Sequence, residues 1–382
     1  MTRIAVVAGE ASGDMLAAHL ITALRERLPE AQFLGVAGPQ MQRAGCTVWY
    51  ASEMLAVRGY VEVLRHYRRI SAMRRELLQR LLQQPPDLFI GVDAPDFNLW
   101  LERRLKDAGV RTLHHVSPSV WAWRRGRIPA IARATHHLLT LFPFEAPLYK
   151  DSGVDVTYVG HPLADMLPLQ VDKAAARRRL NLSEDCAPVV ALLPGSRLSE
   201  LQYMAATFID VADLLRRRHE KAIFLAPMAT QAGRDLFSAE LQRRKGERLP
   251  LRLLFGHARD ALAACDVALV ASGTATLEAA LLKAPMVITY RMSPWTWRIM
   301  KGMNYLPWVG LPNILAGEFL VPELLQDKAQ PLALANALDD LLADEARRQR
   351  ITERFGDMHR QLRQGAADKA AAVVLSMLGC KA

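Results

Sequence analysis

Short apolar runs of strand length alternate with longer amphipathic segments along most of the chain. In the first half these runs are bounded by glycine, proline and polar residues, and helical patterns lie between most of them. Such alternation predicts a parallel, doubly wound sheet. The strands expected in this half are 3–8, 32–36, 87–92, 111–116, 137–142 and 154–159.

The pattern lapses after Asp165 into a segment rich in proline and charge, which is typical of a linker. It begins again with expected strands at 189–193, 222–226, 251–255, 267–271 and 286–290, and residues 346–378 are helical and alanine-rich. We therefore predict an α/β fold with two Rossmann-like, doubly wound parallel-sheet domains that face a cleft. The predicted parts are an N-terminal domain 1–168, a linker 169–187, a C-terminal domain 188–345 and a helical segment 346–382.

The composition, 51% hydrophobic and 23% charged over 382 residues, is ordinary for a soluble globular protein of two domains. No apolar run reaches the length of a membrane span, and the N-terminus lacks the pattern of a signal peptide. The four cysteines, Cys46, Cys186, Cys265 and Cys380, show no C-x-x-C spacing. The sequence thus predicts a cytoplasmic protein without disulfides or structural zinc.

A net charge of +10 calls for an anionic partner, which is nucleic acid, a membrane surface or a phosphorylated substrate. Nucleic-acid modules usually add aromatic stacking motifs or a recognition helix, and neither is found in the sequence. We therefore expect no nucleic-acid partner.

The segment Gly195-Ser196-Arg197 joins an expected strand to an expected helix, 198–218. Free backbone N–H groups and the positive end of the helix dipole make such a turn suitable for phosphate. Gly195 permits close approach, Ser196 can cap the helix, and Arg197 can donate two hydrogen bonds to phosphate oxygens. The same local pattern also occurs in α/β proteins without any ligand.

A second turn of this kind is Ser272-Gly273-Thr274, between the strand 267–271 and a helix expected at 275–283. Glu278 in that helix is well placed to bind a ribose diol, as acidic residues do in nucleotide-binding folds. The alternative explanation for Glu278 is a favourable charge near a helix N-terminus.

Acidic residues follow two of the expected N-terminal strands. The first strand leads into the loop 9–14, where Ser12 and Asp14 are explained by helix capping but Glu10 is harder to explain structurally. Asp93 ends the strand 87–92, where it could accept a proton from an attacking hydroxyl or simply form a turn. Asp96 is expected to be the N-cap of a helix starting at Phe97.

Tryptophans and arginines gather in the loop after the strand 111–116. Trp121 and Trp123 beside Arg124, Arg125 and Arg127 suggest a wall and a basic clamp for a phosphorylated, sugar-like or partly apolar ligand. His161 follows the last strand of this half and either contacts ligand or orders the crossover. Four other histidines lie in strand-like runs without metal-ligand spacing and are interpreted as packed side chains: His114, His115, His136 and His137.

The predicted helix 59–82 carries more apolar residues than one core-facing stripe requires, and arginines are interleaved among them. This combination is typical of a helix that lies in a membrane interface. The alternative is a buried helix with a basic edge, since Met73, Leu77, Leu78 and Leu81 are expected to face a core. The residues assigned to the membrane face are Val61, Val63, Leu64, Tyr67 and Ile70.

Several of these segments together resemble the lipid-A-disaccharide synthase family, and the match runs essentially end to end. The N-terminal half contributes GEASGD at 9–14, GVDAPDFN at 91–98 and SPSVWAWR at 117–124. The C-terminal half contributes LLPGSR at 192–197, SGTATLE at 272–278 and LPNILAG at 311–317. The departures are conservative, such as Ala11 where some relatives carry Thr.

The resemblance implies an inverting glycosyltransferase of the two-domain GT-B architecture, acting at the cytoplasmic face of the inner membrane in lipopolysaccharide synthesis. Such an enzyme joins UDP-2,3-diacylglucosamine to 2,3-diacylglucosamine 1-phosphate (lipid X) and releases UDP and the β-1,6-linked lipid A disaccharide 1-phosphate. It implies no metal and no cofactor. An anionic membrane surface is an expected partner, and the oligomeric state is left open, a homodimer included.

The resemblance and the residues together assign a different role to each half of the chain. The C-terminal half is expected to bind the UDP-sugar, and the N-terminal half to supply the acceptor side and the base. Asp93 is the predicted general base, with Glu10 as the alternative. The expected UDP-sugar contacts are Gly195, Ser196, Arg197, Ser272, Gly273, Thr274, Glu278 and Asn313, and the expected acceptor-side residues are Ser12, Asp14, Trp123, Arg124 and His161.

Two other classes of function remain open at this point. One is a nucleic-acid or anionic-lipid binding protein without chemistry, which would have no need of Asp93. The other is a different UDP-N-acetylglucosamine enzyme of the same architecture, either a MurG-type transferase or a nonhydrolysing 2-epimerase. A surface that binds acyl chains distinguishes the lipid enzyme from the epimerase, which needs none.

Overall fold

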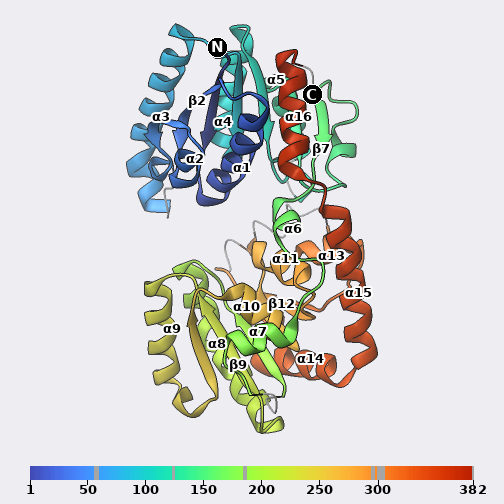
Figure 1. The fold of residues 1–382 in the computed structure, drawn as a ribbon. Coiled ribbons are helices and arrows are strands. Elements are labelled where there is room, and N and C mark those ends of the chain that lie inside the picture. Colours follow the sequence, from blue (N-terminus) through green and yellow to red (C-terminus); the bar gives the residue numbers. More distant parts are fainter. Residues whose placement is uncertain (56–59, 123–124, 184–186, 294–296, 299–305, 381–382) are drawn as a thin grey trace. The chain divides into compact units, whose positions relative to one another are not determined.

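The computed structural model describes residues 1–55, 60–122, 125–183, 187–293, 297–298 and 306–380, and for residues 60–67 it describes the backbone alone. The chain divides into two compact units (Figure 1). Unit 1 is Met1–Asp165 with Leu362–Ala382, and unit 2 is Met166–Gln361. The C-terminal helical segment is therefore shared between the units, which differs from the separate segment expected at 346–382.

Within the described residues, unit 1 is built on a seven-stranded parallel sheet in the order β3-β2-β1-β4-β5-β6-β7. Both faces are covered by helices, which is why the central strands are continuous apolar runs. The strands are β1 (Arg3–Ala8), β2 (Gln32–Ala37), β3 (Thr47–Ala51), β4 (Leu88–Val92), β5 (Arg111–His115), β6 (His137–Thr140) and β7 (Asp155–Tyr158).

The helices of unit 1 follow the strands as crossovers, and a last one returns from the C-terminus. They are α1 (Ala11–Arg27), α2 (Pro39–Arg43), α3 (Tyr60–Gln83), α4 (Pro95–Asp107), α5 (Ile128–Ala134), α6 (Pro162–Met166), which ends at the boundary of the unit, and α16 (Ala366–Leu378). Short 3-10 turns lie at Ser52–Met54, Arg125–Arg127 and Ala146–Tyr149. Helix α16 packs on α1, and Asp368 pairs with Arg27 at 2.9 Å.

One core cluster of unit 1 lies between the sheet and helices α3 and α4. Met73, Leu77 and Leu81 of α3 are buried against β1, β2 and β4, and Leu78 packs partly against the same cluster. The expectation that these four residues face a core is confirmed. Ile70, assigned to the membrane face, is half-buried and also packs against this cluster.

Unit 2 repeats the plan with a parallel sheet of six strands among the described residues, in the order β10-β9-β8-β11-β12-β13. The strands are β8 (Val189–Leu193), β9 (Ile223–Met228), β10 (Leu251–Phe255), β11 (Val267–Ala271), β12 (Met286–Tyr290) and β13 (Glu323–Leu325). The helices are α7 (Lys173–Arg179), α8 (Leu198–Arg218), α9 (Gln231–Arg243), α10 (Ala258–Ala264), α11 (Thr274–Leu281), α13 (Leu311–Ala316), α14 (Pro331–Ala343) and α15 (Glu345–Leu362). Two 3-10 turns lie at Gly246–Arg248 and Gln326–Lys328.

Strands β3 and β13 and helix α7 lie where the sequence pattern indicated no element. The residues of β3 are exposed or half-buried and β13 has three half-buried residues, so neither forms the apolar run that marks a central strand. Helix α7 lies inside the expected linker, where the Asp172 carboxylate accepts the Ala175 N–H at 2.8 Å and caps the helix. The segment 169–187 thus belongs to unit 2 and does not form a separate linker.

Candidate functional site

The predicted bases lie at the point of unit 1 where the strand order reverses. From β1 the chain continues outward through β2 and β3, whereas β4 begins the other half of the sheet. Loops diverge at such a switch point, and doubly wound proteins bind ligands there. Ala8 pairs with Val92, so the loops carrying Glu10 and Asp93 leave the sheet side by side. A Cβ on Gly9 would lie 2.9 Å from the Ala94 Cβ, so these loops are in contact.

The backbone around Asp93 is held in an unusual conformation. Asp93 has φ 52° and Ala94 has φ 43°, and Val116 in the next loop has φ 84°. Left-handed backbone costs about 1 to 3 kcal/mol per non-glycine residue and concentrates at functional sites. The Asp93 N–H donates to the His115 carbonyl at 2.9 Å, and the Asn98 Nδ2 donates to the Asp93 carbonyl at 2.8 Å. These bonds hold the backbone of Asp93 in this conformation.

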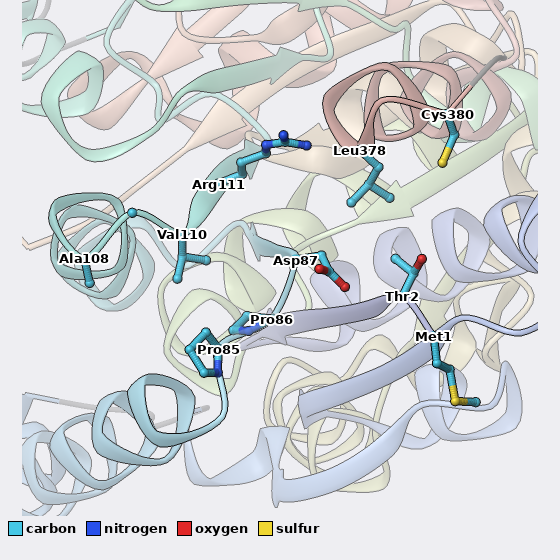
Figure 2. Close-up of a pocket in the computed structure, with 11 residues that line it drawn as sticks. Met1, Thr2, Pro85, Pro86, Asp87, Ala108, Val110, Arg111, Leu378 and Cys380 are labelled. Atoms are coloured by element: carbon cyan, nitrogen blue, oxygen red, sulfur yellow. The ribbon is translucent and has the colours of Figure 1, made fainter.

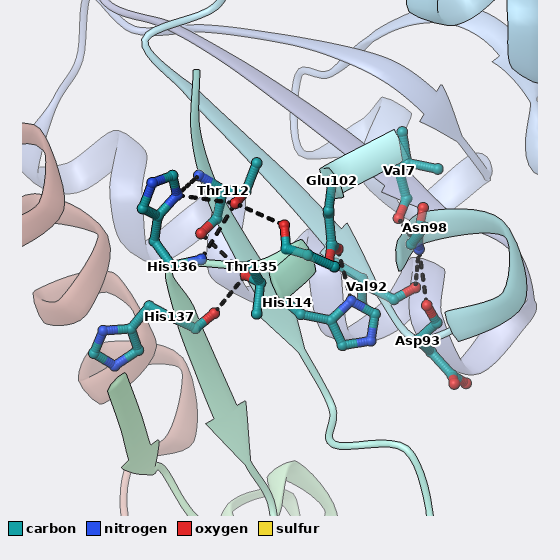
Figure 3. A network of polar contacts seen from close by, with 11 residues as sticks. Val7, Val92, Asp93, Asn98, Glu102, Thr112, His114, Thr135, His136 and His137 are labelled. Atoms are coloured by element: carbon teal, nitrogen blue, oxygen red, sulfur yellow. Dashed lines mark hydrogen bonds and ion pairs between the residues drawn. The ribbon is translucent and has the colours of Figure 1, made fainter. Parts of the chain in front are cut away.

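A buried polar network lies behind the Asp93 loop (Figure 3). The Asn98 amide faces the carbonyls of Val7, Val92 and Asp93, while the Asp93 carboxylate points away from the network. The Glu102 carboxyl and the His114 imidazole, both fully buried, are 2.6 Å apart. Burial raises the pKa of Glu102, and His114 partly opposes that rise.

Gly91 is required by this network. A Cβ at Gly91 would lie 2.1 Å from Glu102 Oε1, so a larger residue could not share the space with the buried carboxyl. No sequence pattern indicated Glu102, because its partner His114 belongs to the next strand. The packed interpretation of His114 and His115 is confirmed, since both are buried on β5.

A pocket of about 350 Å³ opens beside Asp93. Its described lining comes from the loops after β4 and β5 and from the 3-10 turn before α5: Asp93, Pro95, Asp96, Val116, Ser117, Pro118, Ser119, Val120 and Arg127. Arg127 Nη2 lies 2.7 Å from Asp96 Oδ1. The expected capping role of Asp96 is wrong, because α4 starts at Pro95 with Ala94 as its N-cap.

Asp14 has a structural role that its position in the sequence did not indicate. It is 2% exposed, and its carboxylate accepts the N–H groups of Gly38, Gln40 and Met41 at 2.9, 2.9 and 3.0 Å. It therefore stabilises the start of α2, and this corrects its assignment to the acceptor side. Ser12 and Glu10 are exposed.

The loops predicted to bind the acceptor are supported by Glu145, which sequence reasoning missed. Its buried carboxylate accepts the N–H groups of Leu141 and Phe142 at 3.0 and 2.9 Å. Burial raises the pKa of Glu145 to about 7, although these bonds and a hydrogen bond from Trp121 oppose the rise. Glu145 thereby links the segment after β6 to the tryptophan loop.

His161 is fixed by its surroundings in unit 1. Its ring lies 5.5 Å from the Phe142 ring, and its Nδ1 accepts the Leu163 N–H at 3.2 Å. Burial lowers the pKa of His161 to about 4, so the imidazole is neutral at physiological pH. Trp123 and Arg124 lie outside the described residues, as do the side chains of Val61, Val63, Leu64 and Tyr67.

In unit 2 the two predicted ligand turns meet at the corresponding switch point. The sheet reverses between β8 and β11, which pair directly. Gly195 follows β8 with φ 126°, and Gly273 follows β11 with φ 152°. The first of these angles is adopted almost only by glycine, so Gly195 is required for the turn.

The first turn already holds an anion from within the chain. Glu200 Oε2 accepts the N–H groups of Ser196 and Arg197 at 3.0 and 3.2 Å, and Arg197 Nη1 lies 3.4 Å from Glu200 Oε1. The N-cap of α8 is Arg197, so Ser196 does not cap it. These two amides are therefore satisfied within the chain by Glu200, the N3 residue of α8.

Glu278 and Tyr290 face the same edge of the unit 2 sheet. Glu278 Oε1 is 2.8 Å from Arg259 Nε, and the Glu278 side chain is 20% exposed. Burial and the charge of Glu200 raise the pKa of Tyr290, while Arg197 opposes the rise. Tyr290 therefore lies close to the first turn, which its position at the end of β12 could have suggested.

Asn313 is fully buried and satisfied by groups of unit 2. Its Nδ2 donates to the Val321 carbonyl at 2.9 Å and to Glu323 Oε1 at 2.8 Å, and its Oδ1 accepts the Val321 N–H at 2.9 Å. In this structure Asn313 joins α13 to the segment that precedes β13. This differs from the direct UDP-sugar contact expected for it.

Another pocket of unit 1, of about 560 Å³, lies at the opposite, amino-terminal edge of the sheet (Figure 2). Its charged residues are engaged within the chain, because Asp87 accepts the Arg3 N–H at 2.8 Å and Arg111 donates to the Met377 carbonyl. None of the residues predicted for the site lines it. Within the described part of the chain, no group of three His, Cys, Asp or Glu residues is placed to hold a metal ion.

Two solved structures share this fold. Over 99% of this chain and 98% of the other, it is similar to CalG4, the calicheamicin glycosyltransferase, with a TM-score of 0.64 and 15% identity. The chain is also similar to the structure of S. aureus MnaA with UDP, with a TM-score of 0.63 and 13% identity. This match covers 100% of this chain and 99% of that chain. These likenesses show the fold of the chain, which is the GT-B fold with two parallel-sheet units.

The particular family follows from sequence. Residues 4–376 match the family model described as Lipid-A-disaccharide synthetase. The lipid-A-disaccharide synthase of Azoarcus sp. (strain BH72) is 57% identical over 380 residues, which cover 100% of this chain and 97% of the relative. The chain belongs to the lipid-A-disaccharide synthase family.

Proposed function

We propose that this glycosyltransferase joins UDP-2,3-diacylglucosamine to 2,3-diacylglucosamine 1-phosphate and releases UDP and a β-1,6-linked disaccharide 1-phosphate. The observation that carries the proposal is the chemistry of the two switch points. One presents carboxylates beside a pocket, and the other presents amides and a guanidinium already arranged around an anion. Family membership supports the substrates.

Asp93 acts as the general base in this mechanism, with Glu10 on the adjoining loop as the alternative. The base takes the proton of the acceptor's 6-hydroxyl as that oxygen forms a bond to the anomeric carbon of the donor. The bond from that carbon to the diphosphate oxygen breaks, and UDP leaves with the electron pair. Attack opposite the leaving group inverts the anomeric centre and gives the β linkage.

Unit 2 holds the nucleotide. The Ser196 and Arg197 amides and the Arg197 side chain bind the diphosphate, and Glu278 binds the ribose. The two amides and the Arg197 guanidinium stabilise the negative charge of the leaving UDP most strongly as the bond breaks, which is the condition for catalysis. The structure of S. aureus MnaA contains UDP, which supports a nucleotide role for this fold.

Acylated substrates require access to a lipid surface. None of the helices in the described part of the chain is long and apolar enough to cross a membrane. Helix α3 supplies the proposed contact, through Val61, Val63, Leu64 and Tyr67 together with interleaved arginines that bind anionic lipid phosphates. The protein would then act at the cytoplasmic face of the inner membrane.

The test is incubation with the acylated UDP-glucosamine donor and the acylated monophosphate acceptor. We expect UDP and a disaccharide 1-phosphate to form together, in equal amounts and without added metal. Release of free sugar or epimerised donor in place of the disaccharide would contradict the proposal. Such an outcome would favour a 2-epimerase or hydrolase of the same fold.

A further inference from the structure

The Arg127 guanidinium lines the pocket beside Asp93, and the proposed reaction does not yet use it. Among the described residues that line this pocket, Arg127 is the single cation, and two carboxyl-bearing side chains, Asp93 and Asp96, line the pocket with it. Its 3-10 turn, Arg125–Arg127, leads directly into α5. A volume of about 350 Å³ is in the range of small-molecule sites.

The ion pair between Arg127 and Asp96 is easily opened. The two side chains are 27% and 84% exposed, and Asp96 lies in the first turn of α4. Exposed pairs of this kind contribute about 0 to 1 kcal/mol, because water solvates the separated charges well. A phosphate with two free oxygens can bind the guanidinium fork through two parallel hydrogen bonds and outcompete one exposed carboxylate.

We propose that Arg127 binds the phosphate group of the acceptor sugar, and that Asp96 occupies the guanidinium when no acceptor is present. The inference rests on the proposed function, since it identifies what holds the non-reacting end of that substrate. Asp93 and Arg127 line one pocket, so one molecule can present a hydroxyl to the carboxylate and a phosphate to the guanidinium. Arg127 would thereby select phosphorylated acceptors.

The experiment compares two acceptors, the acylated glucosamine 1-phosphate and the same sugar without its phosphate. Arg127→Ala should raise KM for the phosphorylated acceptor by about ten-fold or more, since a charged hydrogen-bond pair is lost. The variant and the parent should use the unphosphorylated sugar equally, and the donor KM should not change. Arg127→Lys should retain part of the preference, and Asp96→Asn should lower KM for the phosphorylated acceptor.

Arg133→Ala is the matched control, because Arg133 is an exposed residue of the adjoining helix α5 that does not line the pocket. It should behave as the parent with both acceptors. Equal losses with both acceptors in Arg127→Ala, or an unchanged preference for phosphate, would overturn the inference. If Arg127→Ala does not fold, the KM values of Arg127→Lys and Asp96→Asn for the phosphorylated acceptor test the inference in its place.

Failure of the proposed function is separable from failure of this inference. Titration with soluble glucosamine 1-phosphate, followed by NMR or calorimetry, measures binding without turnover. Suppose that the parent releases no UDP in the assay but binds this probe, and that Arg127→Ala does not bind it. The proposed reaction would then be wrong and the proposed phosphate site correct. Probe binding that is equal in the parent and Arg127→Ala would reject the site.

Discussion

The two switch points have the same topology and opposite chemistry. In unit 1 the loops after β1 and β4 carry Glu10 and Asp93, whereas in unit 2 the loops after β8 and β11 offer backbone amides and Arg197. In unit 1 the non-glycine residues Asp93 and Ala94 have left-handed backbone at the turn that carries the Asp93 side chain. In unit 2 the corresponding turns have glycine at the positive φ angles, at Gly195 and Gly273. The parallel sheet fixes where ligands bind, and the loop residues decide which chemistry occurs.

The largest effect is expected from removing the proposed base in unit 1, and it tests the first half of this comparison. Asp93→Asn should slow turnover by about 100 to 10,000-fold, because a positioned base is removed, and should leave UDP affinity unchanged. Single-turnover kinetics and UDP titration measure both quantities. The control is Asp107→Asn at the far end of α4, which should keep parental rates. Parental turnover in Asp93→Asn would move the role to Glu10.

The next effect concerns unit 2. Arg197→Ala and Glu278→Gln should each weaken UDP binding by about 1.5 to 3 kcal/mol through the loss of a charged hydrogen bond. This corresponds to roughly 10 to 150-fold in Kd by titration calorimetry. Arg259→Ala removes the partner of Glu278 without removing the carboxylate, and should cost less. Affinities equal to the parent would exclude Arg197 and Glu278 from the site.

A smaller effect is expected for vesicle binding, and it distinguishes the proposed membrane face of α3 from the side of α3 that packs on the core of unit 1. Replacing Val63, Leu64 and Tyr67 together by Ser should reduce co-sedimentation with anionic vesicles by at least about ten-fold, since each apolar side chain contributes on the order of 1 kcal/mol and a ten-fold change requires only about 1.4 kcal/mol. High salt should weaken binding of the parent. Ile70→Ser is the contrasting variant, because Ile70 packs on the core and its replacement should lower stability more than binding. A triple variant that binds vesicles normally would contradict the membrane role.

The smallest effect is a change in how stability depends on pH. The pKa of Glu145 is about 7 in the folded chain, against 4.5 for an ordinary glutamate. Between these values the folded chain keeps a proton that the unfolded chain has lost, so this residue lowers stability as pH rises, by at most about 1.4 kcal/mol per pH unit. Glu145→Gln should remove that decline.

Urea unfolding of parent and variant at pH 5, 6 and 7 measures the difference. His115 and His161, whose pKa values burial lowers to about 4, act in the opposite direction but are present in both proteins. The difference between the two proteins therefore isolates Glu145. Identical pH profiles would show that its carboxyl is ionised in the folded state throughout this range.

Local pattern predicted the elements with strong apolar runs and clear ends. The bounds of β1, β8, β11 and α8 agree with those expected, because a buried parallel strand or a long amphipathic helix is specified by its own residues. The edge strands β3 and β13 were missed because half-exposed strands lack that run. The carboxylates at strand ends were found by position in the sequence alone.

What the sequence could not reveal depends on contacts between distant segments. The three N–H partners of Asp14 lie 24 to 27 residues away, so its capping of α2 instead of α1 was not visible. Glu102 and His114 meet only when α4 packs on β5, and Glu145 contacts Trp121 only through the folded sheet edge. Arg127 was seen as a basic residue, but its pocket required the structure.

Glu200 places a carboxylate of the chain itself on the two amides that are proposed to bind UDP. If UDP binds the Ser196 and Arg197 amides as proposed, its arrival and departure exchange one anion for another and never leave the two N–H groups without an acceptor. The carboxylate then competes with UDP in every cycle, which limits how tightly the product can be held. On this proposal, product inhibition and the rate of UDP release are set in part by a residue that need not touch either sugar.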